Sequence, residues 1–225
     1  MNKVQSEGVC VYCNKTVKKQ GLSRHIATHL KQMELETKKP QNALHLVVSA
    51  GPYFLHLLVP AICDLADLDY FLRDIWLECC GHISAFSHVR YGDDIDKDTR
   101  IGKAFERIDS LFYAYDFGST TELGIANKGI YNIPTKQIVL VSRNQPLPIM
   151  CSTCQKLPAT CMCIVHYDGD SGWYCKVCAP KHKKECSDFA DYAKMPVVNS
   201  PRCGVCGYTG GIIDKVRDGV YKLPI

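Results

Sequence analysis

Hydrophobic positions in the middle of the chain first form two short runs and then a helical stripe. The runs Leu44–Val48 and Phe54–Val59 flank Ser49–Pro52, a pattern typical of two strands joined by a turn. Asp64 then fits a helix N-cap, and apolar side chains recur every three or four residues as far as Cys80. We therefore expect a hairpin followed by an amphipathic helix that ends close to this cysteine.

The pattern after this helix predicts more strands than helices. Strands and helices in this mixed order predict an α+β domain with a mainly antiparallel sheet and two helices. The expected elements are a strand at Phe86–Tyr91, a short helix at Ile101–Ile108, and strands at Leu111–Asp116, Thr121–Ala126 and Gln137–Ser142.

On both sides of this region, the regular spacing of apolar residues ends and cysteine pairs appear. We place the predicted domain boundaries at these two changes. Lys38-Lys39-Pro40 interrupts the pattern and indicates a linker. We expect a zinc finger at 1–33, a linker at 34–42, the α+β domain at 43–147, a two-zinc module at 148–190 and a tail with a cysteine pair at 191–225.

Fourteen cysteines in 225 residues are far more than usual, and they can be disulfide partners or metal ligands, depending on the compartment. Residues 1–8 are polar and contain no apolar leader segment, and the longest apolar run, Phe54–Cys63, is broken by His56 and Pro60. We therefore expect a cytoplasmic protein with no membrane partner, in which metal rather than oxidation holds the cysteines.

The first cysteine pair belongs to the pattern C-x2-C-x11-H-x3-H. Two histidines four residues apart lie on one face of a helix, opposite a turn that carries the cysteines. The pattern resembles the Cys2His2 zinc finger, with one residue fewer than usual between the pairs. Its expected zinc ligands are Cys10, Cys13, His25 and His29.

Charge is concentrated in the same segment, although the net charge of the whole chain is only +4. Residues 1–40 contain eight Lys or Arg against three Glu, which favours a polyanionic partner. Counted back from His25, Lys18 and Arg24 occupy positions that face bases in such fingers. With Lys19 they are the candidate nucleic-acid contacts, and the alternatives are a protein-docking or purely structural finger.

The region from Ala43 to Ser142 resembles a known family. The succession LHLVV, FLHLLVP, DLADLDYFLRDIW, CCGHISAF and YAYDFGSTTEL is similar to the family named after the third open reading frame of a root-inducing plasmid, also labelled transposon-passenger TnpR-like. Its most specific piece is Tyr115–Gly118, after which many relatives carry Asp-Gly-Trp and this chain does not. The resemblance implies an α+β fold and an origin in bacteria or mobile elements, and it implies no particular reaction.

The densest cysteine region lies between residues 151 and 186, where seven cysteines and a histidine form four close pairs. Two four-ligand zinc sites can be filled sequentially, each by neighbouring pairs, or alternately. The segment resembles MYND and B-box zinc modules, which are wired alternately as a cross-brace, and we favour that arrangement. It joins Cys151 and Cys154 to Cys175 and Cys178, and it joins Cys161 and Cys163 to His182 and Cys186.

Two further features bear on the number of metal ions. His166 could compete as a ligand, but we interpret this lone histidine as an ordinary surface residue. The tail pair, Cys203 and Cys206, needs two more ligands to bind a zinc ion. Either it joins the Cys79–His82 segment or its thiols stay free. We expect three zinc ions, with a fourth if Cys203, Cys206, Cys80 and His82 come together.

These features predict a non-enzymatic protein. Closed, sulfur-rich zinc sites leave no coordination position for water, and the chain has no phosphate-binding glycine loop, nucleophile elbow or H-E-x-x-H. We expect a zinc protein that binds nucleic acid through the finger and is associated with bacterial mobile elements, with no small-molecule substrate. The alternative is a protein-interaction adaptor that uses the MYND-like module, and a metalloenzyme is the third hypothesis.

Overall fold

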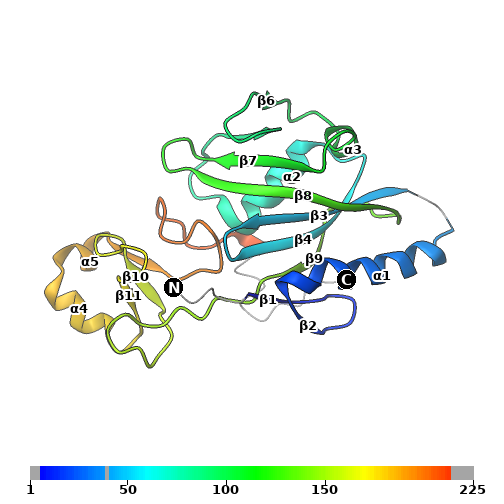
Figure 1. Cartoon of the computed structure of the whole chain (residues 1–225). Helices are drawn as coiled ribbons and strands as arrows, with labels where there is room; N and C mark the ends of the chain where they lie inside the picture. Colours follow the sequence, from blue (N-terminus) through cyan, green and yellow to red (C-terminus); the bar gives the residue numbers. More distant parts are fainter. Residues whose placement is uncertain (1–5, 39–40, 214–225) are drawn as a thin grey trace. The chain divides into compact units, whose positions relative to one another are not determined.

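The computed structural model describes residues 6–38 and 41–213, which divide into two compact units. The N-terminal unit comprises the residues up to Asp74 together with Gly81–Gln145. The C-terminal unit comprises Ile75–Cys80 together with the residues from Pro146 onward. Each unit has its own sheet (Figure 1). A short segment from the middle of the sequence therefore belongs to the C-terminal unit.

A seven-stranded antiparallel sheet forms the centre of the N-terminal unit, in the order β6-β5-β7-β8-β3-β4-β9 (Figure 1). The predicted hairpin is present as β3 (Asn42–Ala50) and β4 (Tyr53–Pro60). The predicted α+β class with a mainly antiparallel sheet is confirmed. The other strands are β5 (Ser84–Ser87), β6 (Asp94–Ile95), β7 (Ser110–Tyr115), β8 (Thr121–Asn132) and β9 (Val139–Arg143), and α3 (Ile101–Ala104) is a single turn.

Two short strands and a long helix precede this sheet. Strand β1 (Glu7–Val9) pairs with β2 (Thr16–Lys18), and α1 (Lys19–Glu36) follows without a break. The backbone N–H of Val11 donates to the carbonyl of Val141 at 3.0 Å, which ties the turn after β1 to β9. These elements are thus part of the N-terminal unit.

The apolar face of α1 is buried against the sheet. Its three fully buried side chains are four residues apart, so they lie on one side of the helix. Burial of an aliphatic side chain contributes about 1.5–3 kcal/mol, so this contact anchors the helix. The buried cluster joins Leu22, Ile26 and Leu30 to Ala43, Phe54, Leu58, Tyr131, Ile133 and Val141.

Helix α1 continues to Glu36, beyond the point where the sequence predicts a linker at 34–42. The Glu34 carboxylate accepts hydrogen bonds from the backbone N–H of Asn132 at 2.7 Å and from its side-chain amide at 2.9 Å. Thr37 donates its hydroxyl to the carbonyl of Met33 at 2.9 Å. This contact with the end of β8 extends the helix where the apolar period has already stopped.

Helix α2 (Leu65–Leu72) begins at the predicted N-cap. The carboxylate of Asp64 accepts from the backbone of Asp67, and the carboxylate of Asp67 accepts from the backbone of Asp64. The helical segment expected to run to about Cys80 continues beyond α2 as a π-helical turn, η1 (Arg73–Leu77), and ends at Leu77.

A buried carboxylate fastens α2 to the sheet. Asp69 accepts hydrogen bonds from Tyr113 at 2.6 Å, Ser84 at 2.7 Å, Arg73 at 2.9 Å and Lys97 at 3.2 Å. Burial alone would raise its pKa, but the hydrogen bonds from Tyr113 and Ser84 and the charges of Arg73 and Lys97 hold the pKa below its usual value. Asp69 therefore stays ionised and joins α2 to β5 and β7.

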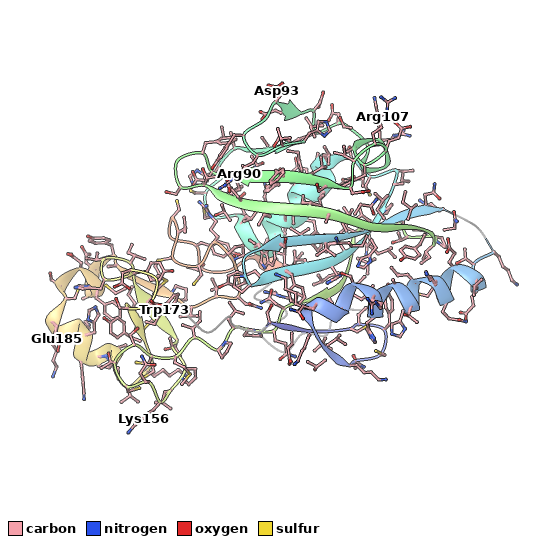
Figure 2. All side chains as sticks on the ribbon, viewed as in Figure 1. Arg90, Asp93, Arg107, Lys156, Trp173 and Glu185 are labelled. Atoms are coloured by element: carbon pink, nitrogen blue, oxygen red, sulfur yellow. The ribbon has the colours of Figure 1, made fainter. Side chains whose placement is uncertain are left out.

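The C-terminal unit contains only short elements as far as residue 213. Its three-stranded sheet has the order β11-β10-β12, with Met162, Trp173 and Met195 in a small apolar cluster. Figure 2 marks Trp173 within this unit. Such short elements bury too little apolar surface for a large core. They are β10 (Cys161–Cys163), β11 (Trp173–Tyr174), α4 (Ala179–Glu185), α5 (Ser187–Asp191) and β12 (Lys194–Pro196).

Two histidines share a hydrogen bond inside the N-terminal unit. Nε2 of His45 in β3 lies 2.9 Å from Nδ1 of His56 in β4, and both side chains are buried. Burial lowers the pKa of His45 to about 4 and that of His56 to about 3, helped for His56 by the proximity of His45. Both rings are therefore neutral at pH 7, with one ring N–H donating to the other ring.

We expect acid to destabilise the N-terminal unit through this pair. The unfolded histidines take up protons near pH 6.5 and the folded ones do not, so stability falls as pH drops from about 6.5 toward 3. The loss by pH 5 is about 2 kcal/mol per histidine. Urea unfolding at pH 7 and pH 5 measures it. The double variant His45→Leu/His56→Leu should lose less unfolding free energy between pH 7 and pH 5 than the wild type. An equal loss would contradict this account.

Candidate metal centres

The fourteen cysteines form no disulfide bonds, and most of them converge in groups, some of which include histidine. In each of four groups the ligand atoms all lie within 4.8 Å of one another, which is close enough for a single metal ion. Four Cys/His groups in the described part of the chain could therefore hold metal ions.

The first group consists of Cys10, Cys13, His25 and His29, as the sequence predicts. The cysteines lie in the turn between β1 and β2, and the histidines lie one turn apart on α1. Sγ of Cys13 is 3.2 Å from Nε2 of His25. Burial, followed by the charges of His29 and Lys15, lowers the pKa of His25 and favours the neutral imidazole that binds metal.

The second group consists of Cys151, Cys154, Cys175 and Cys178. Burial raises the pKa of the Cys151 thiol, but hydrogen bonds from the backbone at Cys154, Cys175 and Thr153 outweigh it and lower the pKa to about 6. Backbone hydrogen bonds at Lys156 and Leu157 lower the pKa of Cys154 in the same way. The first pair is therefore readily available as thiolates, the form that binds metal.

The third group consists of Cys163, His166, His182 and Cys186. Sγ of Cys163 is 3.3 Å from Nδ1 of His166. His182 is stacked on Tyr174 with ring centroids 4.1 Å apart, and its Nε2 is buried with no hydrogen-bond partner among the described residues. A buried imidazole nitrogen without a partner is costly, and a metal ion would satisfy it.

The structure does not bring Cys161 into this group, although the sequence predicts it as a ligand there. Sγ of Cys161 instead donates to the carbonyl of Tyr174 at 3.5 Å, and burial raises the pKa of its thiol. His166 takes its place. A signal was available in the sequence, because Cys163 and His166 are separated by two residues, as in the other knuckles.

Within the C-terminal unit, the fourth group consists of the thiols Cys79, Cys80 and Cys206. His82 belongs to the N-terminal unit, where its Nε2 lies 3.4 Å from a carboxylate oxygen of Asp116. The ligand set expected from the sequence contains Cys203, whereas the structure brings Cys79 to Cys80 and Cys206.

Cys203 joins none of the metal groups formed by the described residues. Its thiol packs beside Met162, with the sulfurs 4.0 Å apart, and accepts a hydrogen bond from the backbone of Val198 at 3.5 Å. Burial raises the pKa of this thiol. Cys203 is therefore a core residue of the C-terminal unit.

The three candidate nucleic-acid contacts differ in their environment. Lys18 and Arg24 are exposed, and Lys18 lies opposite Glu7 in the β1–β2 pair. Lys19 donates its ammonium to the carbonyl of Gly51 at 2.7 Å, and burial lowers its pKa. Lys18 and Arg24 are thus accessible to a partner, while Lys19 is engaged within the unit.

Comparisons with known proteins add little to this geometry. No family model and no curated protein matches the chain. One similar solved structure is a protein of unknown function, MM3350, from Methanosarcina mazei Go1. It shares 17% identity with a TM-score of 0.39, and the match covers 44% of this chain and 67% of that one. A likeness at this level assigns neither a family nor an activity, and the resemblance in residues 43–142 stays a prediction.

A helix that is both long and apolar enough to cross a bilayer does not occur between residues 6 and 38 or between 41 and 213.

The third group yields a test that separates His166 from Cys161. We expect His166→Ala to lose or weaken one bound metal ion, because it removes a donor atom, whereas Cys161→Ala retains the wild-type metal content. Metal per chain, measured by elemental analysis after dialysis, checks this. Metal loss from Cys161→Ala with His166→Ala unchanged would restore the ligand set expected from the sequence.

Proposed function

We propose that the protein is a non-enzymatic zinc protein whose finger binds nucleic acid. The first three Cys/His groups have the composition of structural zinc sites. Each offers four sulfur or nitrogen donors, the number that a structural zinc ion takes, and leaves no open position for a reacting water. Zinc at such sites contributes on the order of 10 kcal/mol to folding, which compensates for small cores. The metal thus holds the fold, and the function lies on the surface.

The observation that carries nucleic-acid binding is the exposed face of α1 and its preceding turn. The opposite face is buried on the sheet, so the helix presents mainly polar side chains, with Leu35 exposed in its last turn. Between residues 15 and 31, the side chains of four exposed cations make no hydrogen bond or ion pair with any described residue. They are Lys15, Lys18, Arg24 and Lys31.

Neither acidic residue of α1 forms an ion pair with these cations in the described part of the chain. The Glu34 carboxylate accepts from Asn132 at 2.7 Å, and the Glu36 carboxylate accepts from Gln32 at 2.6 Å. The unpaired cations suit the phosphate backbone of DNA or RNA, which such contacts bind without base specificity. An association with bacterial mobile elements rests only on the resemblance of residues 43–142.

A second candidate function is a protein-interaction adaptor, and a groove in the C-terminal unit favours it. The groove has a volume of about 640 Å³ and is lined by α4, α5 and β12. Its walls carry Lys176, Lys183 and Lys194 and no acidic residue. Lys194 Nζ lies 5.9 Å from the ring centroid of Phe189. Cations around an apolar floor suit a peptide that combines acidic and apolar side chains.

The charge-reversed double variant Lys18→Glu/Arg24→Glu tests the first function. We expect it to weaken binding to DNA and RNA oligonucleotides and to lower the slope of log affinity against log salt by about 1 for each lost contact. Fluorescence anisotropy at several salt concentrations measures both. Lys103→Glu, at an exposed site on α3, is the single-charge control and retains binding. If no DNA or RNA binds at low salt, the proposal fails.

Lys183→Glu/Lys194→Glu tests the groove. We expect this variant to lose binding of a fluorescein-labelled peptide in which Glu alternates with Leu and Phe, because it removes two cations from the walls. Lys156→Glu alters an exposed lysine of the same unit outside the groove, marked in Figure 2, and retains binding. Equal binding of a counterpart peptide with Lys in place of Glu would contradict charge recognition.

A further inference from the structure

Three thiols of the C-terminal unit form a cluster that differs from its two metal groups. Cys79 and Cys80 come from the segment that follows η1, and Cys206 lies far along the chain. Sγ of Cys80 is 3.7 Å from Sγ of Cys79 and 3.6 Å from Sγ of Cys206. Zinc–sulfur bonds of about 2.3 Å in a tetrahedron place sulfurs about 3.8 Å apart. The cluster therefore already has the spacing of a thiolate metal site.

We propose that Cys79, Cys80 and Cys206 form an exchangeable site for a thiophilic cation, with Zn²⁺ as the ion and Cd²⁺ as its probe. Three thiolates leave one tetrahedral position for a fourth ligand that can be replaced. Soft thiolate donors select such ions over Mg²⁺ or Ca²⁺. This site is separate from the nucleic-acid and peptide surfaces proposed above.

The charge around the cluster supports a bound cation. A divalent ion with three thiolates carries a net charge of −1. Nη2 of Arg202 donates to Sγ of Cys79 at 3.5 Å, and the Arg202 side chain is fully buried. A buried guanidinium needs a nearby negative charge, and a hydrogen bond from a cation favours the thiolate form of cysteine. Arg202 would balance the metal–thiolate centre.

The backbone that carries Cys206 is held in an uncommon conformation. Cys206 has φ of 49°, and the neighbouring Gly204 and Gly207 have φ of 79° and 68°. A left-handed residue other than glycine is unfavourable and persists where its surroundings fix it. The turn aims Cys206 at Cys80, while Cys203, the other half of the C-x2-C pair, packs in the core.

Exposure distinguishes this site from the other centres. Cys80 and Cys206 are exposed, whereas the second and third groups each have three buried ligands. Chelators and competing ions therefore reach the cluster without unfolding the unit. The first ion to exchange is expected to be the one held by these three thiols.

The tail pair supplies a matched comparison for the test. We expect Cys206→Ala to bind one metal ion fewer than the wild type and Cys203→Ala to bind the full number, because only Cys206 contacts Cys80. A coloured chelator added to zinc-loaded protein should show a fast phase in the wild type and in Cys203→Ala. That phase should be missing in Cys206→Ala. Equal metal content and equal kinetics in both variants would overturn the proposal.

A measurement on the wild type keeps the test independent of variant folding. Cd²⁺ added to zinc-loaded protein should replace this ion first and protect Cys79, Cys80 and Cys206 from alkylation, as read by mass spectrometry. Rapid alkylation of Cys80 and Cys206 in the presence of saturating Cd²⁺ would refute the site. Failure of the nucleic-acid or peptide assays leaves this result unaffected, because neither assay depends on these thiols.

Discussion

The convergence of cysteine and histidine side chains on single points is the constraint on which the C-terminal unit depends. Its strands have two or three residues and its helices five or seven, so little apolar surface is available. In the second group, Cys151 from before β10 meets Cys175 from after β11, and in the third group Cys163 of β10 meets Cys186 at the C-terminal end of α4. Because donor pairs alternate along the chain, each point of convergence requires that the intervening segment be folded as well.

The N-terminal unit obeys a different constraint. Its sheet is broad enough to hold a conventional core, and the finger elements add to that core through Leu22, Ile26 and Leu30. A metal ion between the β1–β2 turn and α1 would fix the start of the helix, while the sheet fixes its length. A partner cannot reach the face of α1 that packs on the sheet, and the side of α1 that carries Arg24 and Lys31 remains accessible.

Local patterns in the sequence predict local structure well here. The β3–β4 hairpin and the Asp64 cap follow from alternation and capping chemistry within a few residues. The predictions that were wrong or incomplete depend on distant partners. Helix α1 extends past Glu34 because Asn132, far along the chain, donates hydrogen bonds to the Glu34 carboxylate. Cys79 lies close to Cys206 because the chain folds back on itself. The spacing of two cysteines or histidines shows that they can bind one metal ion together, but it does not show which two pairs share an ion. His166 differs from these cases, because the two residues between Cys163 and His166 give the spacing of a zinc-ligand pair and could have indicated His166 as a ligand.

The segment Ile75–Cys80 has a consequence for dividing the protein. Its Ser200–Trp76 hydrogen bond of 2.7 Å lies within the C-terminal unit, while the chain on both sides belongs to the N-terminal unit. No single cut of the chain separates the two units intact. Truncation after Gln145 would leave Trp76 without the serine that caps its carbonyl, and a fragment that begins at Pro146 would lack two of the three clustered thiols. The two units are therefore expected to be inherited, expressed and lost together.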